Sequence, residues 1–398
     1  MSEVRPFHIE VPEADLDDLR QRLAQTRWPD QPPGMGWDHG VPLDYLRELA
    51  DYWRTSYDWR RHEADLNQFP LFITTIDGQR LHFVHMRSVE PGALPLMMIH
   101  GWPGSIVEFA KVLRPLADPR SHGGALADAF DVIAPSIPGF GFSGPTEETV
   151  WDLDRVTVVF AELMERLGYD RYGAHGGDFG ALVSPALGRL HPDRVVGVHV
   201  NGIPTVVGRG QTAGLSDADL ERLETLQRLW RDQRGYAVIQ STRPQTLAYG
   251  LTDSPVGQLA WIVEKFKEWT DSVEVPEDAV DRDQLLTHVT LYWLTATAGS
   301  SASFYKEDPT LSRMAGSAGS SSRSREATGS VVRPDQPSAV PTGVAVFPRE
   351  LTVSIRHLSS QSHNIVHWTE FDRGGHFPAM EVPDLLVEDL RRFFRQVR

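Results

Sequence analysis

The chain has 398 residues, a formal net charge of −15 and no cysteine. The acidic balance argues against nucleic acid as a partner, because phosphate contacts need a basic surface. The absence of cysteine excludes disulfides, thiol catalysis and cysteine zinc sites. There is neither a signal-peptide core nor an apolar run of about 18 residues. We therefore expect a cytoplasmic protein without a membrane anchor.

Residues 1–90 form an N-terminal segment with a pattern of its own. Leucines at spacings of three and four predict a helix that opens at Pro12, and a second helix follows from Leu43. Two β-rich runs flank Asp77 and Gly78, which predicts a hairpin. We expect this segment to wrap around the rest of the protein.

Short apolar runs alternate with helical patterns through residues 91–201. The runs at residues 96–99, 130–135 and 195–200 predict buried strands. Strand–helix alternation implies a mostly parallel sheet that is covered by helices on both faces. Strand signals and a last helix return in residues 338–398, so we assign both parts to one α/β core.

The segment between these two core parts has a different character. Residues 202–313 are mostly helical in pattern, with charged faces and aromatic anchors, which predicts a helical lid inserted between core strands. Residues 314–337 are rich in Ser and Gly and poor in apolar side chains. That composition predicts a flexible loop.

The run HGGDFG at residues 175–180 places Asp178 between a strand-like approach and a helical segment. Strand, tight glycine turn and helix form the nucleophile-elbow pattern, which usually presents a serine. An aspartate there would form an ester with an alkyl carbon, so its natural electrophiles are epoxides and alkyl halides. An aspartate that only caps the helix is the alternative. Glycines at positions 176 and 180 favour the nucleophile.

The run HGWPGS at residues 100–105 directly follows a predicted strand. A His-Gly turn at that place supplies one backbone N–H group of an oxyanion hole, and the residue after the nucleophile supplies the other. We therefore assign the oxyanion hole to the N–H groups of Trp102 and Phe179.

The general base and its acid follow the nucleophile in chain order. His376 stands in the run RGGHFP, between a terminal strand and the last helix, where the base belongs. Glu350 comes just after the strand predicted at residues 344–347, and a carboxylate there would orient the imidazole. Asp372 is the rival acid, although it is too near His376 in sequence to lie behind it comfortably.

These motifs resemble those of the microsomal-type epoxide hydrolases, including the juvenile hormone epoxide hydrolases, of the α/β-hydrolase superfamily. HGWPGS, GGDFG, FPRE and GGHF occur in that order, and TRWP, YDWR and LNQFP resemble the N-terminal domain of the family. The resemblance covers nearly the whole chain. It implies an α/β-hydrolase fold, in which helices flank a mostly parallel central sheet, with an inserted lid and an N-terminal wrapping segment.

The resemblance also implies two lid tyrosines that hydrogen-bond the epoxide oxygen. Residues 235–244 resemble the first site and give Tyr236, with Tyr249 as the rival. Residues 303–307 resemble the second site and give Tyr305.

The implied reaction converts an apolar epoxide and water to a vicinal diol. It runs through a hydroxyalkyl ester on Asp178, which is hydrolysed by water that His376 and Glu350 activate. It needs neither a metal ion nor an organic cofactor. Mammalian members have an N-terminal membrane anchor, which we do not expect here, and a homodimer would be unsurprising.

Two other functions stay open. A haloalkane-type dehalogenase uses the same Asp–His–acid triad but typically has a tryptophan after the nucleophile, where this chain has Phe179. Trp102 is one alternative halide donor. A non-catalytic hydrolase-like protein that binds a small molecule would not require an intact triad. A serine esterase is disfavoured because the elbow has no serine.

Overall fold

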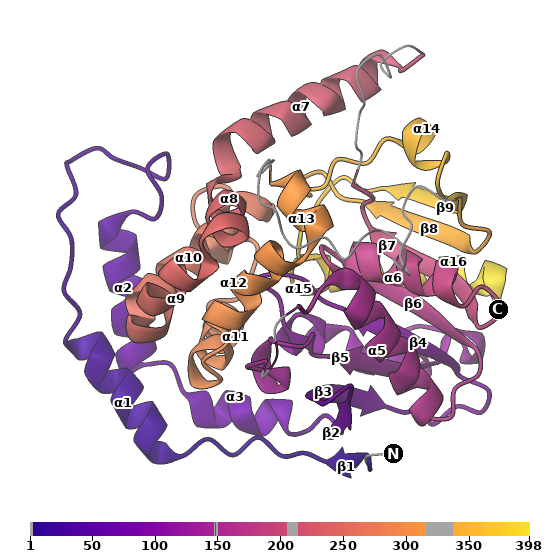
Figure 1. The fold of residues 1–398 in the computed structure, drawn as a ribbon, viewed down its shortest axis with the longest axis horizontal. Helices are drawn as coiled ribbons and strands as arrows, with labels where there is room; N and C mark the ends of the chain where they lie inside the picture. Colours follow the sequence, from indigo (N-terminus) through magenta and orange to yellow (C-terminus); the bar gives the residue numbers. More distant parts are fainter. Residues whose placement is uncertain (1–2, 147, 149, 205–213, 316–336) are drawn as a thin grey trace.

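The computed structural model describes residues 3–146, 148, 150–204, 214–315 and 337–398. Within these residues one sheet of nine strands has the order β1-β2-β3-β5-β4-β6-β7-β8-β9 (Figure 1). The strands are Arg5–Pro6 (β1), Leu71–Ile76 (β2), Gln79–Met86 (β3), Leu94–Ile99 (β4), Phe130–Pro135 (β5), Tyr172–Gly177 (β6), Val195–Asn201 (β7), Pro341–Val346 (β8) and Asn364–Glu370 (β9).

The larger part of the sheet is parallel, as expected from the alternation of strands and helices. Strands β5, β4, β6, β7, β8 and β9 pair in parallel, whereas β1, β2 and β3 add an antiparallel edge. Residues 96–99 are fully buried, because helices cover both faces of these strands. On β6, a Cβ at Gly173 would meet Phe394 of α16 (Pro383–Val397), and one at Gly176 would meet α6 (Gly180–Leu190). The two helices therefore lie on opposite faces.

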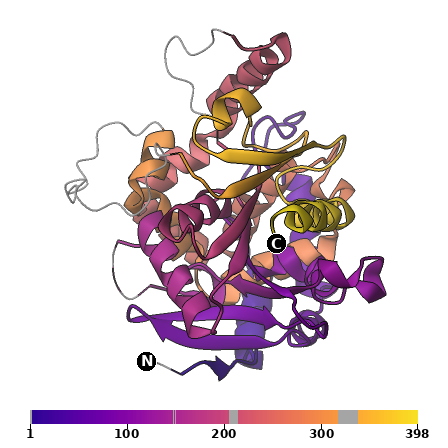
Figure 2. The ribbon, with the colours of Figure 1, turned by 90° about the vertical axis from the view of Figure 1, so that its right-hand side faces the viewer.

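Helices fill the chain between β7 and β8. They are Asp217–Gln233 (α7), Gly235–Thr242 (α8), Pro244–Asp253 (α9), Pro255–Trp269 (α10), Arg282–Leu294 (α11), Ala298–Glu307 (α12) and Pro309–Met314 (α13). We call these helices the lid. They lie beside the carboxyl ends of the parallel strands, and α7 projects from the body in both views (Figures 1 and 2). The loop predicted at 314–337 lies almost wholly outside the described residues.

The N-terminal segment contacts both the sheet and the lid. Helices α1 (Glu13–Ala24), α2 (Leu43–Thr55) and α3 (Trp59–Leu66) run along the lid, and β2 and β3 form the predicted hairpin (Figure 1). Trp53 Nε1 donates a hydrogen bond to Thr290 Oγ1 of α11 at 2.8 Å. The sequence analysis missed β1 and α3. Helix α3 begins after Asp58, whose carboxylate accepts the backbone N–H groups of the first turn.

A network of buried polar side chains ties α16 to the sheet. The Asp389 carboxylate accepts hydrogen bonds from His199 Nε2 of β7 at 2.9 Å and from His367 Nε2 of β9 at 2.8 Å. His199 Nδ1 in turn lies 3.0 Å from His175 Nδ1 of β6. Burial by itself raises the pKa of Asp389, but the hydrogen bonds from His199 and His367 outweigh it and leave the pKa lowered. The network therefore holds an ionised carboxylate inside the protein.

We predict that Asp389→Ala lowers the free energy of unfolding by about 3–5 kcal/mol, because it removes the carboxylate that pairs with the buried imidazole of His199 and the half-buried imidazole of His367. Urea unfolding followed by circular dichroism measures the loss. The matched control is Glu388→Ala, which removes an exposed pair with Arg392 and should cost less than about 0.5 kcal/mol. Equal losses in the two variants would contradict the role of the network.

Candidate active site

Asp178 stands in the turn between β6 and α6, with a backbone φ of 52°. That left-handed conformation is unfavourable for a residue with a side chain. The backbone segments around the turn approach closely and hold Asp178 in this conformation. A Cβ at Gly176 would lie 2.4 Å from the carbonyl carbon of Gly180, and a Cβ at Gly180 would lie 2.0 Å from Ile99 O. Only glycine fits at both flanks, as the elbow pattern predicts.

The loop after β4 lies directly against the Asp178 carboxylate. Trp102 N–H donates a hydrogen bond to Asp178 Oδ1 at 2.9 Å, and a Cβ at Gly101 would lie 2.2 Å from the same oxygen. Tyr292 of the lid anchors this loop, because its hydroxyl donates to Gly104 O at 2.7 Å. Phe179 directly follows Asp178 in the elbow, so its N–H group stays a predicted second donor.

His376 lies between two carboxylates. Its Nδ1 atom donates to Glu350 Oε1 at 2.6 Å, and its Nε2 atom lies 3.5 Å from Asp178 Oδ2. The rival acid Asp372 is exposed. Burial opposes the charged imidazole, but the charges of Glu350 and then Asp178 outweigh it, so the pKa of His376 is raised well above its usual value. His376 therefore links the two acids, and both of them favour its charged form.

Tyr236 and Tyr305 reach the same loop from the lid. The Tyr236 ring stacks on the Trp102 ring at 5.1 Å between centroids, and the Tyr305 ring meets it edge-on at 5.8 Å. Tyr249, by contrast, is 70% exposed. Burial, and next the charge of Asp178, raises the pKa of Tyr236; burial likewise raises the pKa of Tyr305. Both phenols therefore stay protonated and able to donate.

Lys265 of α10 adds a buried positive charge behind the tyrosines. Its Nζ atom lies 4.9 Å from the centre of the Tyr236 ring and 2.7 Å from Glu268 Oε2. A cation over a phenol face attracts its electrons, so Lys265 fixes the ring that stacks on Trp102.

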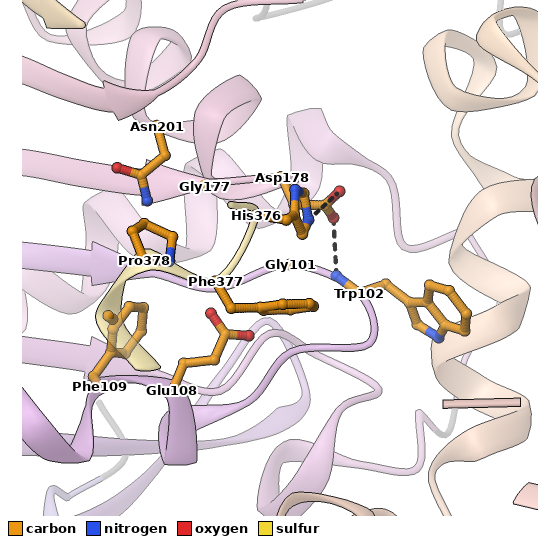
Figure 3. Close-up of a pocket in the computed structure, with 11 residues that line it drawn as sticks. Gly101, Trp102, Glu108, Phe109, Gly177, Asp178, Asn201, His376, Phe377 and Pro378 are labelled. Atoms are coloured by element: carbon orange, nitrogen blue, oxygen red, sulfur yellow. Dashed lines mark hydrogen bonds and ion pairs between the residues drawn. The ribbon is translucent and has the colours of Figure 1, made fainter. Parts of the chain in front are cut away.

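A pocket opens beside the carboxylate, as Figure 3 shows. Asp178 and His376 lie at one wall, with Trp102 on one side of them and Asn201 on the other, and Glu108 lies across the Phe377 ring from His376. The sequence analysis named neither Glu108 nor Asn201. The sequence contained a signal for each of them. Glu108 is an acid inside the otherwise apolar run at residues 106–109, and Asn201 is a polar side chain at the carboxyl end of a parallel strand.

The site defines a protein of the α/β-hydrolase class. At one edge of a mostly parallel sheet it combines an aspartate elbow, a His-Gly loop that donates a hydrogen bond to the aspartate, and a histidine–glutamate pair that follows later in the chain. Comparison with known protein families supports this class. The family model "alpha/beta hydrolase fold" matches residues 95–246, and the model "Epoxide hydrolase N terminus" matches residues 4–109.

Similar sequences and structures extend over nearly the whole chain. A protein of Stigmatella aurantiaca is 45% identical, covering 99% of this chain and 86% of its own length. Epoxide hydrolase 1 of Sus scrofa is 36% identical, covering 98% of this chain and 88% of its own length. The crystal structure of juvenile hormone epoxide hydrolase from Bombyx mori is 29% identical and superposes with a TM-score of 0.87, covering 100% of this chain and 95% of that one.

The chain therefore belongs to the epoxide hydrolase family, and the expected fold and resemblance are confirmed. None of the helices in the described part of the chain combines the length and the apolar composition that a membrane span requires.

We predict that Gly101→Ala lowers turnover of an epoxide by about 10²-fold, because a misplaced carboxylate loses its reactive alignment. Turnover by the purified variant, with circular dichroism to verify folding, measures the effect. Gly250→Ala in α9 is the matched control, since a Cβ there meets nothing within 4 Å. The close approach at position 101 would be refuted by a Gly101→Ala variant as active as the control.

Proposed function

We propose that the protein hydrolyses an apolar epoxide to a vicinal diol through a covalent ester on Asp178. The observation that carries the proposal is the Asp178 carboxylate itself, which is fixed by Trp102 N–H and faces His376 Nε2. Two protonated phenols reach the same loop from the lid. A carboxylate nucleophile opposite phenol donors suits an electrophile that releases an alkoxide.

In the first step an oxygen of Asp178 attacks one oxirane carbon. The carbon–oxygen bond of the ring breaks, and the released alkoxide takes a hydrogen bond and a proton from Tyr236 or Tyr305. General-acid help of this kind contributes about 10²–10⁴-fold in rate. The product of the step is a hydroxyalkyl ester on Asp178.

In the second step a water molecule attacks the ester carbonyl carbon of Asp178 and gives one proton to His376 Nε2. The oxyanion is stabilised by the N–H groups of Trp102 and Phe179. The ester bond then breaks, and the leaving alkoxide takes the proton from His376. The carboxylic acid that remains on Asp178 returns a proton to the tyrosine, so both hydrogens of the water end in the diol.

We infer a preference for an apolar substrate from a second pocket, which lies between Trp102 and the lid helices. This pocket is lined mainly by apolar side chains, among them Leu251, Trp261, Ile262 and Ala298. Apolar walls with a few placed polar groups are typical of small-molecule sites. The cytoplasmic location and the homodimer stay predictions of the sequence.

We predict that His376→Gln forms the ester and then stalls, because no base activates the water, whereas Asp178→Ala forms no ester at all. Intact mass after exposure to a panel of aryl and alkyl epoxides should show an added mass of one whole epoxide on the His376→Gln protein. The control is the double variant Asp178→Ala, His376→Gln, which should stay unlabelled. An adduct on the double variant, or full activity of Asp178→Ala, would refute Asp178 as the nucleophile.

We predict that Tyr236→Phe and Tyr305→Phe each slow ester formation by about 10²-fold or more, because each removes a donor to the alkoxide. Single-turnover kinetics in the His376→Gln background isolate this step. Tyr249→Phe is the matched control and should leave the rate unchanged, since its ring is exposed. Should Tyr249→Phe be slow and Tyr236→Phe normal, the assignment of the first lid tyrosine would be wrong.

A further inference from the structure

Glu108 is a buried acid beside the catalytic pair that the scheme above does not use. It lies on the 3-10 helix Ile106–Lys111, directly after the HGWPGS loop, and is only 9% exposed. Its Oε1 atom has no hydrogen-bond partner among the described residues. A buried carboxyl oxygen without a partner costs free energy, so its presence in this pocket calls for a reason.

The loop that carries Trp102 also fixes where the Glu108 carboxyl group lies. A Cβ at Gly104 would lie 1.9 Å from Glu108 Oε1, so this carboxyl group occupies the space that any other residue at position 104 would fill. Tyr292 and His288 of α11 hydrogen-bond the carbonyl groups of Gly104 and Pro103. The backbone donor to Asp178 and the carboxyl group of Glu108 are thus held by one anchored loop.

A second acceptor without a partner lines the same pocket. Asn201, at the carboxyl end of β7, is 5% exposed, and its Oδ1 atom has no hydrogen-bond partner in the described part of the chain. Both oxygens belong to the pocket that Asp178 and His376 line (Figure 3). Acceptors of this kind, gathered in a small polar pocket, are what a bound water molecule satisfies.

The charge state of Glu108 suits a neutral ligand such as water. Burial, opposed in part by the positive charge of His376 and reinforced by the negative charge of Asp178, raises the pKa of Glu108 to about 8. At neutral pH the group is mostly a carboxylic acid, which both donates and accepts hydrogen bonds. It adds little negative charge to a site that already contains two carboxylates.

We propose that Glu108, together with Asn201, holds the water molecule that hydrolyses the Asp178 ester, an assignment that rests on the proposed function. The water donates one hydrogen to His376 Nε2 and the other to a Glu108 carboxyl oxygen or to Asn201 Oδ1. Its lone pair then points at the ester carbonyl carbon of Asp178. The transferred proton goes to His376, so Glu108 is a positioning residue and undergoes no covalent change.

This assignment separates the two reactants in space. The epoxide oxygen meets Tyr236 and Tyr305, whose rings pack on the Trp102 indole. The water lies in the pocket that Asp178, Glu108 and Asn201 line together, and the Trp102 ring points away from Glu108 and Asn201 there (Figure 3). A substitution of Glu108 should therefore affect the second step and not the first.

The test measures the two steps separately, with styrene oxide as the probe. Stopped-flow tryptophan fluorescence gives the rate of ester formation, and the mass of acid-quenched protein gives the fraction of ester at steady state. We expect Glu108→Leu to form the ester at the wild-type rate and to hydrolyse it about 10²-fold more slowly, since the water loses its alignment. The ester then accumulates.

Glu108→Gln is the matched control, because it keeps the size of the side chain and one acceptor oxygen, and it should restore hydrolysis to near the wild-type rate. Asn201→Ala is a second variant, which should also accumulate ester and which decides the matter if Glu108→Leu does not fold. The water site would be overturned if both variants formed and hydrolysed the ester at wild-type rates. It would also be overturned if the variants slowed ester formation and ester hydrolysis equally. Absence of ester even in His376→Gln would overturn the proposed function itself.

Discussion

The left-handed backbone of Asp178 is the constraint on which the rest of the site depends. A residue with a side chain adopts this conformation only where its surroundings over-determine it, and here the glycines at 176 and 180 let β6, α6 and β4 approach closely enough to do so. The turn lifts the carboxylate above the strand ends. There it meets the Trp102 N–H group of the neighbouring loop and His376 of the loop that follows β9.

The electrostatics of the site give the proposed steps their order. While Asp178 is a carboxylate, burial opposes the charged form of His376, but the interactions with Glu350 and Asp178 outweigh burial and raise the pKa of His376. Ester formation removes the negative charge of Asp178, and with it one of the causes that raise this pKa. The pKa of His376 then falls, which favours the neutral base that the second step needs. In the proposed scheme, loss of the Asp178 charge thus helps His376 to act as the base, while the protonated lid phenols serve the first step.

The sequence predicted the parts of this site that are local in the chain. The glycine pattern around Asp178, and the chain order of Glu350 and His376, reflect turn geometry and fold topology that a short motif carries. The sequence did not predict Glu108 and Asn201 as site residues, because their burial and their lack of hydrogen-bond partners in the described part of the chain arise only when distant segments pack together. The choice between Tyr236 and Tyr249 was open for the same reason: the side chain that faces Trp102 depends on how α8 and α9 lie on the core. Likewise, β1 is too short to give a periodic signal.

The measurement that tests the central claim most directly is a single turnover in water labelled with oxygen-18, with enzyme in excess over styrene oxide. If Asp178 is the nucleophile, the oxygen added to the diol comes from its unlabelled carboxylate, and the label appears in the peptide that contains Asp178. The account predicts unlabelled diol in the first turnover and labelled diol only after several. Labelled diol in the first turnover, with an unlabelled peptide, would mean that water attacks the epoxide directly and would contradict the account.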